Sequence, residues 1–202
     1  MNERALSIDF DGVIFARIPF QWGAIPRLIS KKPLDFSPPD VPRIERMVAA
    51  RTLTLKEKLN LSRHRLPIKE DVADEIPYFS KTMDIYGNTG RLSHFLWTEK
   101  TRRALEKAGI LKYFENIFYK PDGVETVASK LEAVGRLRET YPQVTHVDDN
   151  PRDAIPIALR FPDVQVVILQ DRSTGLFVSM NELQQYPNVR RILKIGELRK
   201  QR

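Results

Sequence analysis

Residues 5–15 read ALSIDFDGVIF and place two carboxylates, Asp9 and Asp11, directly after a short apolar run. That run is typical of a short buried strand over residues 5–9. Taken alone, an acidic pair at the end of a strand favours a turn in which Asp side chains cap backbone amides. The alternative is a site that needs two negative charges. The residues at the ends of the other predicted strands decide between the two.

The composition is that of a globular protein with an excess of basic residues. The chain has 202 residues, 42% hydrophobic and 29% charged, which allows one domain or a core domain with a small insertion. Its 33 Lys and Arg outnumber 26 Asp and Glu, and the net charge of +7 favours anionic partners such as phosphorylated substrates or nucleic acid. It has no cysteine, which excludes disulfides, thiolate nucleophiles and cysteine-ligated zinc. We see no membrane-spanning run and no secretory signal, so we expect a cytoplasmic protein.

The pattern of residues changes twice along the chain. Residues 14–67 combine a proline-rich stretch with apolar residues at roughly helical spacing, which predicts a partly helical insertion. The remaining residues, 1–13 and 68–202, predict a core of alternating strands (5–9, 83–86, 116–119, 144–149, 164–170) and helices (69–79, 98–109, 129–141, 151–161). This alternation predicts an α/β fold, a Rossmann-like three-layer sandwich with a central parallel sheet. Residues 189–202 have the pattern of a basic amphipathic helix.

Polar residues follow four of the predicted strands, and these ends share one edge of a parallel sheet, where ligands bind. They are Asp9 to Gly12 after the first strand, the loop Gly87 to Arg91 after the second, Lys120 or Lys130 after the third, and Asp148 to Asn150 after the fourth. Converging carboxylates suit a hard divalent cation, and Mg²⁺ is the expected one. A hydroxyl, a lysine and an arginine beside them would stabilise the charge of a phosphoryl group.

The ordered set DFDGV, NTGR, a lysine and VDDNPRD resembles the motifs of the haloacid dehalogenase-like hydrolase superfamily, over residues 1–13 and about 68–170. The resemblance implies a phosphatase in which Asp9 is the nucleophile and forms an aspartyl-phosphate. It implies that Asp11 is the general acid and base, with Gly12 allowing the chain to bend after it. It also implies that Thr89 hydrogen-bonds the oxygens of the transferring phosphoryl group.

The resemblance implies further ligands at the same edge. The expected Mg²⁺ ligands are Asp9, the backbone carbonyl of Asp11, Asp148 and Asp149, with Asp153 as a neighbouring acid. The expected substrate-binding residues are Gly12, Asn88, Gly90, Arg91 and Lys120. We favour Lys130 as the motif lysine, because the predicted helix that it opens runs into the strand bearing Asp148. Lys120, in FYKPDG, is the alternative.

Residues 14–67 lie where members of this superfamily carry a cap, so we interpret them as a cap-like insertion. The expected function is a Mg²⁺-dependent phosphomonoester hydrolase for a small phosphorylated metabolite or nucleotide. Three alternatives stay open: a nucleic-acid end phosphatase, suggested by the charge; phosphoryl transfer to an acceptor other than water; and a binding protein without turnover. We expect His146 to be packed rather than catalytic, and His94 to lie at the surface or near the substrate. No feature predicts an oligomeric state.

Overall fold

The computed structural model describes residues 2–16, 67–170 and 183–200. Among them, six strands form one sheet: β1 (Arg4–Ile8), β2 (Asp84–Leu92), β3 (Phe114–Lys120), β4 (Gln143–Asp148), β5 (Gln165–Leu169) and β6 (Val189–Ile192). The helices within the same ranges are α3 (Glu70–Phe79), α4 (Phe95–Lys107), α5 (Thr126–Thr140) and α6 (Pro151–Arg160), with 3₁₀ turns η1 (Leu111–Tyr113) and η2 (Ile195–Lys200). The strand order is β3-β2-β1-β4-β5-β6 and every pairing is parallel.

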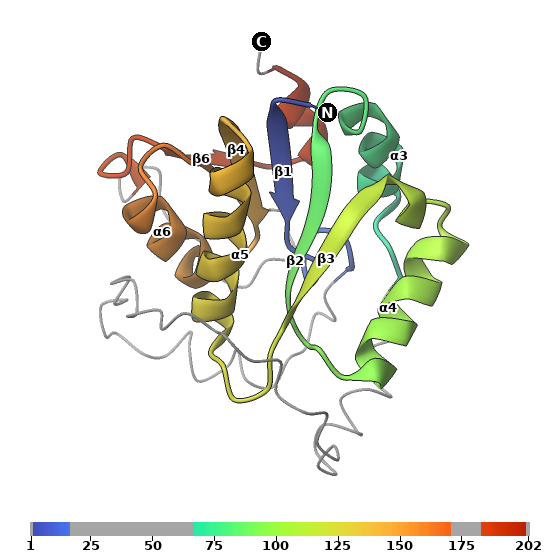
Figure 1. The fold of residues 1–202 in the computed structure, drawn as a ribbon. Coiled ribbons are helices and arrows are strands. Elements are labelled where there is room, and N and C mark those ends of the chain that lie inside the picture. The colour runs from blue at the N-terminus through green and yellow to red at the C-terminus, as the bar shows by residue number, and fades with distance from the viewer. Residues whose placement is uncertain (1, 17–66, 171–182, 201–202) are drawn as a thin grey trace, which may run out of the picture.

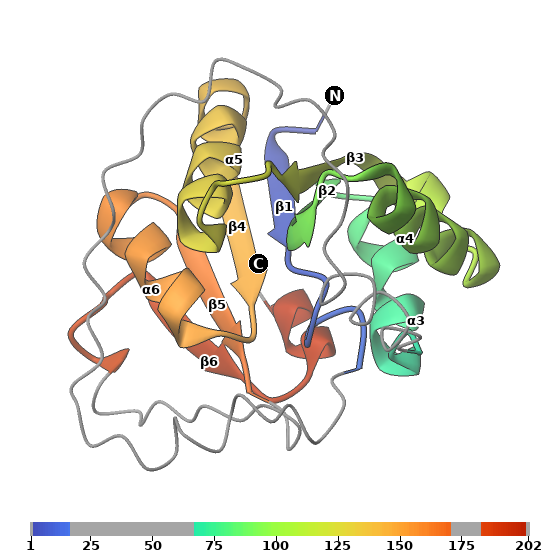
Figure 2. The ribbon, with the colours of Figure 1, turned by 90° about the horizontal axis from the view of Figure 1, so that it is seen from below.

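Helices cover both faces of this sheet, as Figures 1 and 2 show. Side chains of α3, α4 and η2 pack on one face, and side chains of α5 and α6 pack on the other, so the described residues form two apolar cores. Successive side chains of β1 point to opposite faces of the sheet, so Leu6 and Ile8 lie in the first core and Ala5 lies in the second. The predicted α/β three-layer sandwich with a central parallel sheet is confirmed.

The predicted helices over residues 69–79 and 151–161 match α3 and α6 closely. The predicted second helix ends as expected near Gly109, whose φ of 72° suits glycine and whose N–H donates to the carbonyl of Glu106 at 2.8 Å. The prediction that Gly87 to Arg91 form a loop was wrong, because these residues belong to β2 (Asp84–Leu92). The strand expected at 83–86 continues to Leu92, so Thr89 lies within β2, because this stretch pairs with β3 through Thr89↔Tyr119 and, after a shift in register, again at Leu92↔Lys120.

The amphipathic helix predicted for residues 189–202 is wrong over the described part of that range. Residues Val189–Ile192 form β6 instead, which pairs with β5 along the edge of the sheet. Pairing satisfies backbone groups of β5 that a helix would leave open, and this outweighs the local helical pattern. The chain then turns into η2, where Glu197 accepts hydrogen bonds from the backbone N–H groups of Leu193 and Lys194, both at 3.0 Å.

The cap-like insertion predicted for residues 14–67 lies outside the described residues except at its two ends. Those ends are adjacent: the N–H of Ala16 donates to the carbonyl of Pro67 at 3.0 Å, and Phe15 forms β-bridges with Asp11 and Ile68. The two described residues that border this segment, Ala16 and Pro67, therefore lie side by side, close to Asp11. Within the described ranges, no helix has both the length and the apolar character needed to cross a membrane.

Candidate active site

The ends of β1 and β4 bring three carboxylates together. These strands are parallel neighbours, and the N–H of Asp9 donates to the carbonyl of Val147 at 2.9 Å, so Asp9 lies beside the end of β4. Asp9, Asp148 and Asp149 are all buried, and each offers one oxygen atom within 4.8 Å of the others. Grouped and buried carboxylate oxygens are the donor set that Mg²⁺ prefers. The residues present therefore fit the expected cation.

Gly12 is required by the close approach of two chain segments at this cluster. Its φ is 100°, a conformation that side-chain-bearing residues rarely adopt, and a Cβ built there would lie 2.1 Å from Oδ2 of Asp149. The carbonyl of Gly12 accepts a hydrogen bond from Nζ of Lys69 at 2.6 Å, which ties the turn to the start of α3. A glycine after Asp11 thus lets the backbone pass directly over the carboxylate of Asp149.

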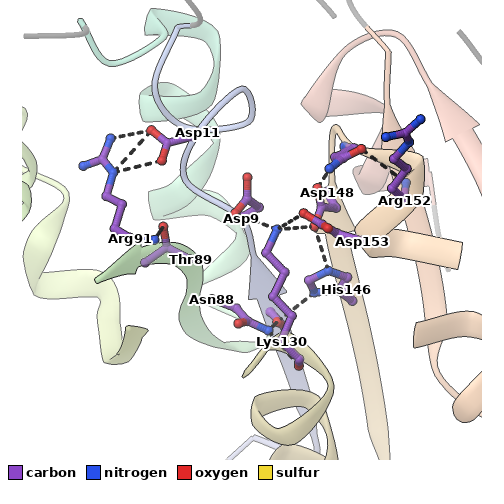
Figure 3. Close-up of polar contacts among 12 residues, drawn as sticks. Asp9, Asp11, Asn88, Thr89, Arg91, Lys130, His146, Asp148, Arg152 and Asp153 are labelled. Carbon is purple, nitrogen blue, oxygen red and sulfur yellow. Dashed lines mark hydrogen bonds and ion pairs between the residues drawn. The ribbon is translucent and has the colours of Figure 1, made fainter. Parts of the chain in front are cut away.

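A single buried ammonium group connects the carboxylates. Nζ of Lys130, on α5, lies 3.0 Å from Oδ1 of Asp9, 2.6 Å from Oδ2 of Asp148 and 3.1 Å from Oδ2 of Asp153 (Figure 3). The residue is only 2% exposed. Lys130 thus contacts three carboxylates, and Asp149 lies within the same cluster as Asp9 and Asp148, so the site concentrates the carboxylate oxygens that a divalent metal ion needs.

The pKa values of Asp9, Asp148 and Lys130 shift in different directions because the surroundings of the three groups differ. Burial raises the pKa of Asp9 well above its ordinary value; Lys130 opposes this shift, and Asp148 and Asp149 reinforce it. Burial would also raise the pKa of Asp148, but Lys130 and His146 outweigh it and hold that pKa below the usual range. Burial would lower the pKa of Lys130, but the carboxylates of Asp148, Asp153 and Asp9 raise it well above its ordinary value. The ammonium thus stays charged.

A chain of buried polar side chains lies beneath Asp148. Nε2 of His146 lies 3.3 Å from Oδ2 of Asp148, and Nδ1 lies 2.9 Å from Oγ of Ser7, the residue paired with it on β1. Asn88 donates from Nδ2 to Oγ of Ser7 and to the carbonyl of Lys130, both at 3.3 Å. His146 is fully buried, as expected, yet it contacts a site residue. The spacing of two residues along one strand, which puts His146 and Asp148 on the same face, could have revealed this contact.

The end of β2 supplies the residues expected to contact a phosphoryl group. Asn88 and Thr89 are buried, and Oγ1 of Thr89 accepts a hydrogen bond from the N–H of Arg91 at 3.2 Å. Gly90 packs against α5, since a Cβ there would lie 2.8 Å from Cγ2 of Thr126. The guanidinium of Arg91 is turned to Asp11, with Nη2 2.6 Å from Oδ1. Arg91, predicted to bind substrate, thus forms an ion pair with Asp11, a partly exposed residue.

The two candidate lysines have different surroundings. Nζ of Lys120 donates to the carbonyl of Val124 at 2.8 Å and of Pro121 at 3.4 Å, within the turn that follows β3. Lys130 is the one that contacts Asp9, which supports the preference for it. His94 caps α4, where its Nδ1 accepts from the N–H of Leu96 at 3.3 Å. That contact gives His94 a structural role.

Comparison with known proteins agrees with this geometry at the level of the fold. No family model matches the chain, and no curated protein matches its sequence. Solved structures do match. A Bacteroides fragilis protein assigned as a haloacid dehalogenase-like hydrolase superposes with a TM-score of 0.59 at 17% identity, over 98% of this chain and 100% of that one. A Thermotoga maritima protein assigned as a beta-phosphoglucomutase gives 0.57 at 16%, over 100% of both chains.

A third match is a Bacillus subtilis protein assigned as a haloacid dehalogenase-like hydrolase and determined with bound magnesium. Its TM-score is 0.54 at 15% identity, over 98% of this chain and 97% of that one. At identities this low, the superpositions show a shared fold. The motif order noted in the sequence and the superpositions agree. The chain has the fold of the haloacid dehalogenase-like hydrolases.

Proposed function

We propose that this protein is a Mg²⁺-dependent phosphomonoester hydrolase that works through an aspartyl-phosphate at Asp9. The observation that carries the proposal is the buried contact between Asp9 and Lys130 within the cluster of Asp148 and Asp149. A carboxylate attacks phosphorus slowly in water, because its charge is repelled by the phosphoryl oxygens. A site that surrounds the carboxylate with cationic groups removes that obstacle.

The proposed reaction has two displacements. An oxygen of Asp9 attacks phosphorus, the bond to the ester oxygen breaks, and that oxygen takes a proton from Asp11. Water then attacks the phosphorus, gives a proton to Asp11, and the bond between Asp9 and phosphorus breaks, which releases phosphate and restores both side chains. The hydroxyl of Thr89 and the N–H of Gly90 would donate to the phosphoryl oxygens.

Mg²⁺ would be held by Asp9 and Asp149, with the backbone carbonyl of Asp11. It would supply positive charge beside the transferring oxygens. Asp148 would act mainly by holding neighbouring groups in place. Its Oδ2 contacts Lys130 and His146, and its Oδ1 accepts a hydrogen bond from the N–H of Asn150 at 2.9 Å. Asp148 and His146 together would keep Lys130 directed at Asp9.

The proposed substrate is a small phosphorylated metabolite or a nucleotide. The hypothesis of a nucleic-acid end phosphatase rests on the net charge alone. Transfer to an acceptor other than water competes with hydrolysis, because the same aspartyl-phosphate serves both reactions, and one protein with this fold is assigned as a mutase. Inorganic phosphate appears in hydrolysis, whereas transfer yields a new phosphate ester.

A phosphate-release screen tests the proposal. The panel contains an aryl phosphate, sugar phosphates, nucleotides and end-phosphorylated oligonucleotides, each assayed with Mg²⁺ and with EDTA. We expect metal-dependent release that Asp9→Asn abolishes. Asp163→Asn is the matched control, because this exposed residue pairs with Arg138 at the surface. Release that survives Asp9→Asn would refute the mechanism. Mg²⁺ binding without turnover on the panel would favour a binding protein.

A further inference from the structure

The guanidinium of Arg91 is held by protein groups through all three of its nitrogen atoms. Nη2 and Nε donate to the carboxylate of Asp11, at 2.6 Å to Oδ1 and 3.1 Å to Oδ2, and Nη1 donates to Oγ1 of Thr101 at 2.8 Å. The Cζ atom also lies 4.1 Å from the ring centroid of Phe15. Arg91 is 7% exposed and Thr101 is fully buried. The orientation of the Arg91 guanidinium is therefore fixed by the protein before any ligand binds.

Two cations from different elements hold the two carboxylates of the DFDG turn. Lys130, from α5, contacts Asp9, and Arg91, from the end of β2, forms a forked pair with Asp11. Figure 3 shows the carboxylate of Asp11 turned toward Arg91 and away from Lys130. The side chain of Asp11 is 36% exposed, against 5% for Asp9, so one carboxylate is enclosed and the other faces solvent on one side.

This separation matches the geometry of the proposed reaction. In a phosphoryl transfer, the attacking and leaving oxygens lie on opposite sides of the phosphorus. The group that attacks and the group that protonates the leaving oxygen must therefore be kept apart, with room for the phosphoryl group between them. A proton donor must also be fixed within about 3 Å of the oxygen that it serves. An anchored, forked arginine fixes a carboxylate more firmly than a single hydrogen bond does.

We infer that Arg91, anchored by Thr101 and Phe15, is a positioning residue that holds Asp11 on the leaving-group side and acts on the reaction only through Asp11. This inference rests on the proposed function. It replaces the role predicted from the sequence, in which Arg91 binds the substrate. Arg91 would then affect the steps in which Asp11 moves a proton, and it would leave substrate affinity unchanged.

The test compares two substrates of similar shape, p-nitrophenyl phosphate and phenyl phosphate, with Mg²⁺ present. p-Nitrophenolate departs without a proton, whereas phenolate needs one, and kcat/KM reports the steps up to that departure. We expect Arg91→Gln to lower kcat/KM about 100-fold for phenyl phosphate, the lower end of the range for proton transfer. For p-nitrophenyl phosphate the loss should stay below about tenfold, since no proton is needed.

A double-mutant comparison shows whether Arg91 acts through Asp11. In the Asp11→Asn background, Arg91→Gln should change kcat/KM no more than about twofold, because residues of one unit are not additive. Arg91→Lys should recover part of the phenyl phosphate activity, since it keeps the charge and loses the fork. Arg103→Gln is the matched control, because this exposed arginine forms only a surface pair with Glu99. It should behave as wild type on both substrates.

Two kinetic results would overturn the inference. The first is an equal loss on both substrates through KM, and the second is a further loss of about tenfold in the Asp11→Asn background, either of which would mean that Arg91 contacts substrate. The ¹⁵N NMR signal of the Arg91 Nε–H group gives a readout without turnover. It should shift and exchange faster in Asp11→Asn. An unchanged signal would overturn the pair itself. If wild type releases no phosphate while this signal shifts, the proposed function fails and the pair stands.

Discussion

The buried ammonium of Lys130 offers a sharp test of how the site is held together. Lys130→Met keeps an unbranched apolar stem and removes the charge. The three carboxylates within 3.1 Å of Nζ, those of Asp9, Asp148 and Asp153, would then lose their common cation. Removing one partner of a buried ion pair costs about 3–5 kcal/mol, because the other charge stays buried. We expect the free energy of unfolding to fall by about 4 kcal/mol, a large part of the 5–15 kcal/mol typical of a domain.

The assay is urea unfolding followed by circular dichroism at pH 7 with EDTA, and the m-value should not change. A loss of about 4 kcal/mol lowers the melting temperature by about 8–16 °C for a chain of this size. Lys112→Met is the matched control, since this exposed lysine lies only over the ring of Tyr113. It should cost less than about 1 kcal/mol. A loss for Lys130→Met no larger than that of the control would refute the ion-pair reasoning.

The pH dependence of the same variant provides a second check. In wild type the pKa of Asp148 is held low, so its contribution to stability is present above the unfolded value, about 3.9, and is lost as the pH falls below it. Lys130→Met removes most of that contribution. The difference in the free energy of unfolding between wild type and Lys130→Met should therefore have its full size at pH 7 and become smaller below about pH 4. Mg²⁺ should recover part of the loss, because it binds the folded state and supplies positive charge.

Three further predictions concern the same cluster. Asp9→Asn should lower the free energy of unfolding of the metal-free protein by less than Lys130→Met does, because burial, which raises the pKa of Asp9, offsets much of the attraction between its carboxylate and Lys130; a loss in urea unfolding as large as that of Lys130→Met would contradict this. Mg²⁺ affinity, measured by calorimetry in wild type, should weaken as the pH falls, because Asp9 must lose its proton to bind; a pH-independent affinity would argue against Asp9 as a ligand. Gly12→Ala should abolish Mg²⁺ binding and cost about 1–3 kcal/mol, because its Cβ would collide with Asp149; calorimetry and unfolding at wild-type values would contradict this.

The strands and the ends that carry the site could be predicted from sequence because their signals are local. Apolar runs that stop at Asp9 and at Asp148 mark two strand ends, and the alternation with helices implies that the strands are parallel. The boundaries of β2 and the identity of β6 could not be predicted in this way. Both depend on pairing with β3 and β5, whose backbone groups are far away in the chain.

The sequence by itself determined which chemical groups the protein has and the order in which they reach one edge of the sheet. Only the tertiary structure decided their partners. Lys130 and Lys120 were both candidates for the motif lysine by sequence. In the structure, Lys130 contacts Asp9, whereas Lys120 donates to backbone carbonyls. Arg91 follows Thr89 in a loop-like motif, yet its guanidinium pairs with Asp11. The physical reason is that charge pairing in a buried site depends on distances of about 3 Å between side chains from separate elements, and no local pattern in a chain specifies these.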